Sequence, residues 1–131
     1  MRETQHKGDT AVAQAIATFT KMGYDVSIPF TESAAYDLII DFYGILRKVQ
    51  VRFSTRGKEV GLRRIHSNSK GYVVKRPQEG AYDWLYILNG NGEEYLVIDK
   101  ITNRNAITPQ KRHLLGNVFT ALLGKQIEQT G

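Results

Sequence analysis

The chain has 131 residues, a formal net charge of +5, 41% hydrophobic and 24% charged residues, and no cysteine. Its length and composition predict one globular domain over residues 1–131 with a single core. The lack of cysteine excludes disulfides, thiolate metal sites and thiol nucleophiles. Because the N-terminus is polar and no apolar run approaches about 18–20 residues, we expect a cytoplasmic protein that does not enter membranes.

Apolar side chains recur at three- and four-residue spacing over residues 10–22, which predicts an amphipathic helix. Asp9 or Thr10 is placed to cap its start, and Gly23 to end it. Residues 25–30 alternate like a short strand, and the proline within them indicates an edge strand or a strand end.

Residues 36–42 and 46–53 are apolar segments on either side of Tyr43-Gly44, which predicts a hairpin. Tyrosine is not an ideal residue for a type I′ turn, so a four-residue loop with the same parity is the alternative. With a two-residue loop, Leu38 faces Val49 and the next pair outward is Asp37 with Gln50. One face of the hairpin then carries Leu38, Ile40, Phe42, Val49, Val51 and Phe53, and the other carries Asp37, Ile39, Asp41, Lys48, Gln50 and Arg52.

Further elements follow along the chain. Residues 60–74 are expected to form a second, basic hairpin that turns at residues 67–71. Residues 84–88 and 95–98 flank an Asn-Gly-Asn-Gly segment, a strong hairpin signal. A Thr-Pro pair predicts the start of a last helix over residues 108–123, which a following glycine would end. Two helices around a mixed sheet with hairpins make an α/β (α+β) layered domain.

Positive charge is concentrated in the middle of the chain. Residues 47–76 hold 10 Lys and Arg residues and only Glu59 as an acid. Such a local field suits a polyanion, and the interleaved polar residues and Tyr72 favour nucleic acid. An anionic membrane is less favoured because the segment alternates like a strand. The alternative interpretation is a solvated basic face.

The polar face of the first hairpin is a candidate metal site. Side chains paired across two strands are about 5 Å apart at Cβ, so Asp37 and Gln50 can direct two oxygens at one point. A carboxylate and an amide oxygen suit Mg²⁺, and Arg52, one diagonal step away, suits a phosphate. The alternative is a solvated hairpin face, and Asp41 is best explained as a strand-end acid. Asp9 lies where it could reach this face, or could act only as an N-cap.

Short motifs follow one another in a recognisable order. They are Lys7-Gly8-Asp9, Gly23-Tyr24, Ile28-Pro29-Phe30-Thr31-Glu32, Tyr36-Asp37-Leu38-Ile39-Ile40-Asp41 and Val49-Gln50-Val51-Arg52. Over roughly residues 7–55 this order resembles the PD-(D/E)xK nuclease superfamily. It is most similar to the group I intron-associated homing endonucleases of cyanobacterial type. The resemblance implies a restriction-endonuclease-like core and site-specific cleavage of DNA with a divalent metal, Mg²⁺ or Mn²⁺.

The same resemblance assigns roles to particular residues. Asp37 matches the first metal ligand and Gln50 the second, a position where Gln can replace Glu. The backbone carbonyl of Val51 completes the ligand set, to which Asp9, the acid after Lys-Gly, can add. Arg52 occupies the position of the catalytic lysine.

The sequence departs from the family pattern at Val12, where members often carry Glu, and at Arg52. Arginine stays protonated and cannot act as a general base, although it can orient a nucleophile and stabilise charge on the phosphate. Three functions therefore stay open: a metal-dependent endodeoxyribonuclease of homing type, a DNA-binding protein on a nuclease fold that no longer cuts, and a Holliday-junction-resolvase-like nuclease.

Double-stranded DNA is the expected partner. A two-stranded basic ribbon fits the major groove, and many of its cations are expected to contact phosphates. Cutting both strands takes two active sites, which predicts a homodimer or higher homo-oligomer. The three histidines have no zinc-ligand spacing. The expected DNA contacts are Arg56, Lys58, Arg63, Arg64, His66, Lys70, Lys75 and Arg76.

Overall fold

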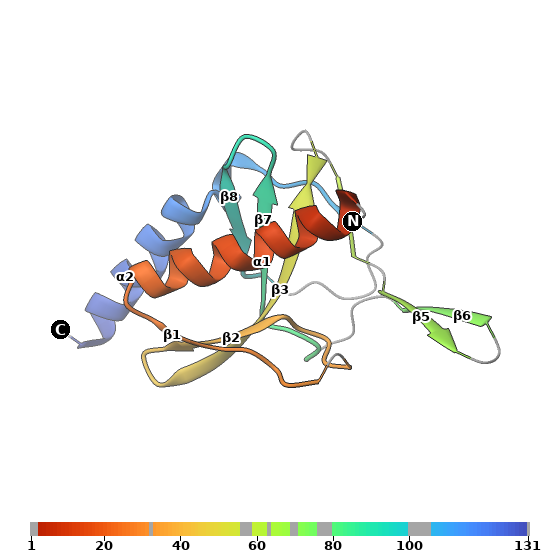
Figure 1. Cartoon of the computed structure of the whole chain (residues 1–131). Helices are drawn as coiled ribbons and strands as arrows, with labels where there is room; N and C mark the ends of the chain where they lie inside the picture. The colour runs from red at the N-terminus through yellow and green to blue at the C-terminus, as the bar shows by residue number, and fades with distance from the viewer. Residues whose placement is uncertain are drawn as a thin grey trace.

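Two helices pack on one face of a mixed five-stranded sheet in the computed structural model, and two small two-stranded sheets complete the fold (Figure 1). This confirms the predicted α+β class. No helix among the described residues is long and apolar enough to span a membrane. The structure describes residues 3–31, 33–55, 59–62, 64–68, 71–75, 80–99 and 106–130.

The first helix, α1 (Glu3–Lys21), begins well before the predicted start. Asp9 lies inside it, so the prediction that Asp9 or Thr10 caps the helix is wrong. The residues ahead of Asp9 include good helix formers, and the Thr10 hydroxyl donates backwards to the His6 carbonyl at 2.8 Å. Gly23, with φ +93°, ends the helix as predicted.

The main sheet consists of β1 (Asp25–Ser27), β2 (Leu38–Phe42), β3 (Ile45–Ser54), β7 (Trp84–Asn89) and β8 (Glu94–Val97), in the strand order β1-β2-β3-β7-β8. Two of the three predicted hairpins, β2–β3 and β7–β8, lie in this sheet, and β1 is an edge strand, shorter than expected. Strands β3 and β7 run parallel, a long-range pairing that joins the two hairpins.

The turn of the first hairpin has two residues. Tyr43 and Gly44 have φ values of +53° and +87°, as a type I′ turn requires, so the four-residue alternative does not apply. The Gly44 N–H donates to Asp41 Oδ1 at 2.8 Å, which stabilises the turn. The predicted register is confirmed from Phe42 opposite Ile45 to Leu38 opposite Val49.

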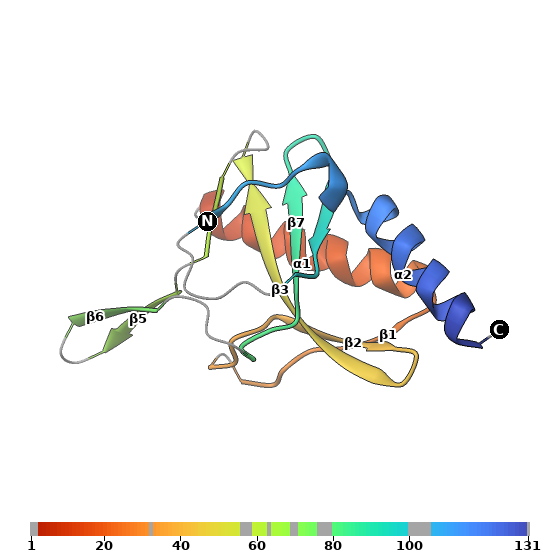
Figure 2. The same cartoon turned by 180° about the vertical axis from the view of Figure 1, so that it is seen from behind.

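The predicted basic hairpin is divided between two small sheets. Strands β5 (Arg64–Asn68) and β6 (Gly71–Lys75) form the hairpin, whereas β4 (Val60–Gly61) pairs with β9 (Ala106–Ile107). The β5–β6 ribbon projects away from the body of the molecule in both views (Figures 1 and 2).

The C-terminal helix begins later than its Thr-Pro signal predicts. A short 3-10 helix, η2 (Lys111–His113), precedes α2 (Leu115–Thr130). Between them Leu114 has φ −53° and ψ 132°, outside the helical region, and bridges to Tyr95 of β8. This tertiary contact interrupts the predicted helix. The expected stop at Gly124 is also wrong, because α2 continues through it.

The main core lies between the sheet and both helices. Phe19 of α1 is fully buried, with ring centroids 6.0 Å from Tyr86 and 6.2 Å from Phe119 of α2. A smaller core on the opposite face of the sheet packs Leu85 and Ile87 against β4 and β9. Successive side chains of β7 point alternately into the main core and into the smaller core, so the strand is buried on both faces.

A hydrogen-bonded carboxylate joins α1 to the sheet. Glu94 Oε2 accepts from the Thr18 hydroxyl at 2.5 Å and from the Tyr86 hydroxyl at 2.6 Å. Burial, with the neighbouring Glu94, raises the pKa of Tyr86, so its hydroxyl stays a donor at neutral pH. The network fixes the position of α1 along β7 and β8.

His113 lies in a buried position between β8 and α2. It is 5% exposed, and its Nδ1 accepts the backbone N–H of Gln110 at 3.0 Å. Burial lowers the pKa of His113, the Arg112 charge lowers it further, and Asp99 opposes both. The imidazole is therefore neutral in the fold.

We expect the protein to lose stability on acidification through His113. Because the folded pKa lies below the unfolded value of 6.5, the unfolded chain binds the proton first as pH falls. This contribution is complete above that value and is lost as pH falls from it towards the folded pKa. Urea unfolding at about pH 7.5 and about pH 5.5 measures the loss, which His113→Gln should reduce. His6→Gln, at an exposed position on α1, should keep it in full. An equal loss in His113→Gln would contradict the assignment.

Candidate active site

Asp37 lies where β2 separates from β3. Its N–H donates to the carbonyl of Val49 at 2.8 Å, although Val49 is the register partner of Leu38. Two successive residues thus lie opposite Val49, the pattern of a β-bulge, which can end strand pairing and redirect a side chain. The prediction that Asp37 pairs directly with Gln50 is therefore wrong, because the ladder ends one residue earlier.

The separation of the strands leaves the Val51 peptide without a strand partner on that edge of β3. Side chains instead of a neighbouring strand form the hydrogen bonds of this peptide. The Val51 N–H donates to Asp37 Oδ2 at 2.8 Å, and the Val51 carbonyl accepts from Arg52 Nη1 at 3.0 Å. N–H and C=O of one strand residue point to the same edge. The Asp37 carboxylate, the Val51 carbonyl and the Arg52 guanidinium therefore meet along this edge.

Gln50 stands beside this edge on the face of the smaller core. It pairs with Leu85 of β7 and is only 6% exposed. None of the hydrogen bonds formed between described residues involves its side-chain amide. Its amide oxygen is a neutral oxygen ligand of the kind that hard divalent cations accept.

Arg52 lies two residues along β3 from Gln50, on the same face, and is half-buried. Besides the Val51 carbonyl, it binds the Gly61 carbonyl of β4 through Nε at 3.3 Å. Tyr82 packs against the smaller core, and its hydroxyl is buried and has no hydrogen-bond partner among the described residues. Burial raises the pKa of Tyr82, and the positive charge of Arg52 opposes that rise.

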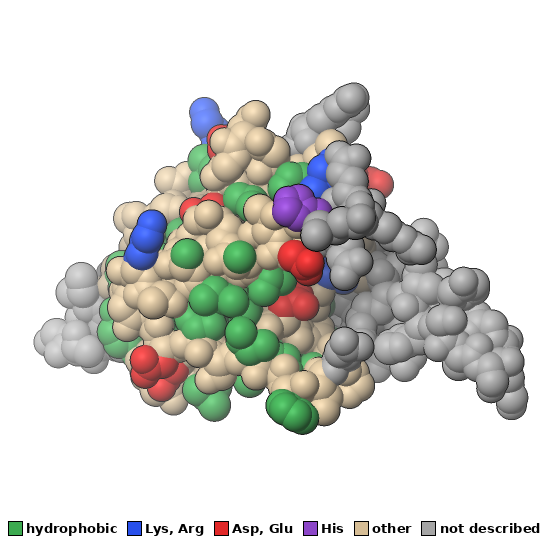
Figure 3. All heavy atoms as spheres, viewed as in Figure 1, with side chains coloured by type: hydrophobic (Ala, Val, Ile, Leu, Met, Phe, Trp, Pro, Cys, Tyr) green, Lys and Arg blue, Asp and Glu red, His purple; other side chains and the backbone are tan. Residues whose placement is uncertain are grey.

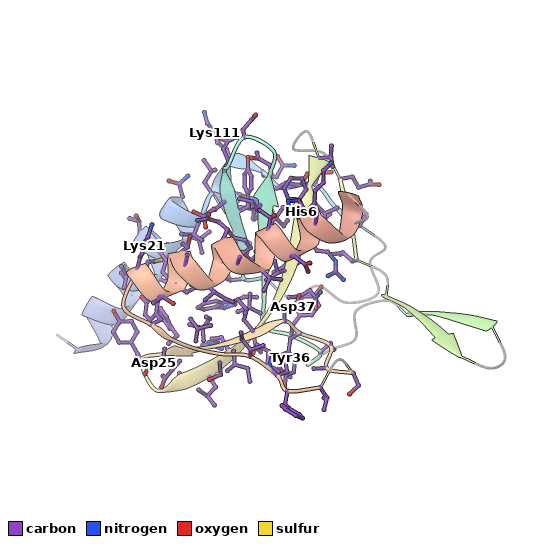
Figure 4. All side chains as sticks on the ribbon, in the orientation of Figure 1. His6, Lys21, Asp25, Tyr36, Asp37 and Lys111 are labelled. Carbon is purple, nitrogen blue, oxygen red and sulfur yellow. The ribbon has the colours of Figure 1, made fainter. Side chains whose placement is uncertain are left out.

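Asp9 is exposed on α1, three residues before Val12 and seven before Ile16, which pack at the margin of the main core. Figure 4 places Asp37 beneath the N-terminal half of α1, and Figure 3 shows acidic side chains gathered on the surface there. Among the described residues no hydrogen bond or ion pair of Asp9 is formed. Its participation in the site stays a prediction.

The residues present fit a hard divalent cation. The Asp37 carboxylate, the Gln50 amide and the Val51 carbonyl are all oxygen donors, as Mg²⁺ and Mn²⁺ require. Within the described ranges, no three His, Asp or Glu side chains lie close enough to hold a metal. A metal here would therefore depend on the amide and the backbone oxygen as well as on carboxylate.

Neither Tyr82 nor Lys48 was assigned a role in the site from the sequence. Lys48 Nζ donates to the Gly80 carbonyl and lies 5.9 Å from the Tyr36 ring centroid, and its N–H donates to Asp83 Oδ2 at 2.8 Å. These contacts hold the segment before β7 against β3. They depend on the parallel pairing of β3 with β7, for which the sequence carried no local signal.

The predicted DNA contacts are only partly within the described residues. Arg64 and His66 are in β5 and Lys75 is in β6, and the register places Arg64 opposite Lys75. Arg56, Lys58, Arg63, Lys70 and Arg76 lie outside the described residues.

A family model described as PD-(D/E)XK endonuclease matches residues 2–108. The chain belongs to this endonuclease family. A solved structure described as a bacterial homing endonuclease, I-Ssp6803I, is similar to it with a TM-score of 0.72 and 24% sequence identity, over 99% of each chain. At that identity the likeness establishes the fold. No curated protein sequence is significantly similar to the chain.

Proposed function

We propose that this PD-(D/E)XK endonuclease is a homing-type enzyme that hydrolyses phosphodiester bonds at specific sites in double-stranded DNA, with Mg²⁺ or Mn²⁺. The observation that carries the proposal is the edge of β3, where the Asp37 carboxylate is held 2.8 Å from the Val51 N–H, beside the Val51 carbonyl. The likeness of the whole fold to a protein described as a homing endonuclease supports it.

Each site residue then has a role. Asp37, Gln50 and the Val51 carbonyl hold the metal, with Asp9 as a further acid. Bound there, a divalent cation supplies Lewis-acid polarisation of the scissile phosphate and a more acidic water. Arg52 cannot take a proton, so its donors orient the phosphate and stabilise the charge that develops on it.

The β5–β6 ribbon is the proposed DNA-reading element. Its backbone register brings Arg64 and Lys75 together at the base of a two-stranded ribbon, the element that fits the major groove. His66 and the neighbouring cations, Arg56, Lys58, Arg63, Lys70 and Arg76, would add contacts to bases and phosphates. A second copy of the chain would supply the second active site for a double-strand cut, in a homodimer or larger oligomer.

Cleavage of supercoiled plasmid in the presence of Mg²⁺ or Mn²⁺ tests the proposal, with a selection of cleaved sequences from a random duplex library to define the site. We expect metal-dependent linear product. A protein that shifts DNA without cutting it with either ion would instead be a DNA-binding protein. The contact between Arg52 and the Val51 carbonyl, a proposed metal ligand, favours the DNA-binding protein that does not cut. Preferential cleavage of four-way junctions over linear duplex would indicate a junction resolvase.

Arg52→Lys is expected to raise the cleavage rate about tenfold or more. Lysine has a compact charge whose pKa can shift, so it can contribute acid–base chemistry that a guanidinium cannot, and such catalysis is worth roughly 10²–10⁴-fold. Single-turnover cleavage measures the rate. Arg47→Lys is the matched control, because Arg47 lies on the opposite face of β3, with its guanidinium 6.0 Å from the Trp84 ring centroid. Unchanged cutting by Arg52→Lys would show that the guanidinium suffices.

A further inference from the structure

Lys48 extends the row of side chains that Gln50 and Arg52 form on one face of β3. Alternate residues of a strand point to the same face, roughly 6.6–6.8 Å apart, and β3 is continuous over Ile45–Ser54. Lys48 therefore stands one step from Gln50, on the side away from Arg52, and adds a cation at that end of the row. The roles given above to Gln50 and Arg52 leave this cation without one.

The Lys48 ammonium contacts two groups, neither of which is an acid. It donates to the Gly80 carbonyl and lies 5.9 Å from the centroid of the Tyr36 ring. The carboxylate of Asp83 accepts the Lys48 backbone N–H at 2.8 Å, and no ion pair of Lys48 forms among the described residues. An ammonium has three N–H donors, so the Gly80 carbonyl leaves two of them for a further acceptor.

Tyr36 places this cation next to the candidate metal ligand. It directly precedes Asp37 in the chain, and Figure 4 shows both residues beneath the N-terminal half of α1. The Tyr36 side chain is only partly buried, and within the described ranges its hydroxyl forms no hydrogen bond. Lys48 Nζ and the Tyr36 hydroxyl thus present unused donors beside Asp37.

We propose that Lys48 and Tyr36 form a second phosphate site, which binds a non-scissile phosphate of the DNA strand held at Asp37. The phosphates of one strand follow one another at about 3.4 Å of helix axis, so a further phosphate lies within about the distance that separates Lys48 from Gln50. Lysine binds phosphate as a point charge, and a hydroxyl adds a neutral hydrogen bond. Such a contact fixes the register of the DNA backbone without reading a base. The inference rests on the proposed function, because it assumes that the scissile phosphate lies at Asp37.

Binding of a short DNA duplex of random sequence, measured without metal ions over a range of KCl concentrations, tests the inference. Lys48→Met removes the charge and keeps an unbranched stem, so we expect about tenfold weaker binding at low salt. The slope of log K against the logarithm of the KCl concentration should become shallower by about 0.9, the value for one lost phosphate contact. Lys48→Arg keeps a cation for the phosphate and should keep the slope. Tyr36→Phe removes a neutral donor, so it should weaken binding about threefold to tenfold without changing the slope.

Lys21→Met is the matched control, because it removes the same charge from an exposed position at the C-terminal end of α1, away from Asp37 (Figure 4). Its salt slope should equal that of the unmodified chain, which excludes an effect of net charge alone. If Lys48 only holds the Gly80 segment against β3, Lys48→Met will unfold at lower urea concentration but keep the full salt slope. That result, or a loss of affinity no larger than that of Lys21→Met, would overturn the phosphate site.

Tyr36→Phe is nearly isosteric and decides the matter if Lys48→Met does not fold. A Tyr36→Phe protein that binds the duplex as tightly as the unmodified chain would then overturn the site.

Cleavage separates failure of this site from failure of the proposed function. In single-turnover reactions Lys48→Met should raise the protein concentration at half-maximal rate about tenfold and keep the maximal rate, because a non-scissile phosphate is bound alike before and during the reaction. If Asp37→Asn abolishes cutting but Lys48→Met keeps the full salt slope, the phosphate site fails and the proposed function stands. If the unmodified chain does not cut but Lys48→Met still lowers the slope, the nuclease function fails and the phosphate contact is upheld. A chain that binds no duplex overturns both.

Discussion

Asp37→Asn is expected to lower metal-dependent cleavage by at least about a thousandfold while the fold stays intact. A metal ligand set supplies several kcal/mol of transition-state stabilisation, and each 1.36 kcal/mol is tenfold in rate. The asparagine oxygen can still accept the Val51 N–H that Asp37 accepts at 2.8 Å, so the β-bulge geometry is kept. The substitution therefore removes the negative charge and little else.

Asp41→Asn is the matched control, because Asp41 lies in the same hairpin and its carboxylate also accepts one backbone N–H, that of Gly44. We expect Asp41→Asn to cut plasmid at the rate of the unmodified chain. Circular dichroism and urea unfolding of both variants check that the folds match. Normal cleavage by Asp37→Asn, or equal losses in the two variants, would remove Asp37 from the active site.

Phe19→Ala is expected to lower the free energy of unfolding by about 3–5 kcal/mol, the usual loss for a buried Phe-to-Ala change. Phe19 is fully buried and joins α1 to both Tyr86 and Phe119, so its loss leaves a cavity that three elements border. Such a change is a large part of the total stability of a typical domain, about 5–15 kcal/mol.

Phe30→Ala serves as the control for Phe19→Ala, because the Phe30 side chain is fully exposed, at 103% relative accessibility. It should change the free energy of unfolding by less than about 0.5 kcal/mol. Linear extrapolation of urea unfolding curves gives both values. A Phe19→Ala protein as stable as the Phe30→Ala protein would show that the two-helix core does not depend on this contact.

The hairpin that carries the site could be predicted from the sequence because its signals are local. Alternation of apolar residues from Leu38 to Phe53 allowed only one register in which the core face stays apolar, and that register is the one observed to Leu38. The turn at Tyr43-Gly44 and the helix end at Gly23 were likewise specified by residues in direct succession.

Long-range contacts decided the features that sequence reasoning did not find. The β-bulge at Asp37 depends on where β2 leaves β3, and the position of Tyr82 depends on the parallel pairing of β3 with β7. At the C-terminus a clear local helix signal was overridden, because Leu114 pairs with Tyr95 and delays the helix. A local pattern cannot contain these partners, which are distant in the chain.

The β5–β6 ribbon has a consequence for how this enzyme can diversify. Within the described residues its two strands pair with each other and with no strand of the main sheet, so substitutions in it leave the backbone bonds of the core unchanged. With DNA reading in the ribbon, as proposed, new target sites can arise there at little cost to stability. Asp37 and Arg52 instead make hydrogen bonds to Val51 of β3, a strand that pairs with β2 on one side and β7 on the other. The fold thus keeps the proposed DNA-reading element apart from the strand that carries the candidate active site.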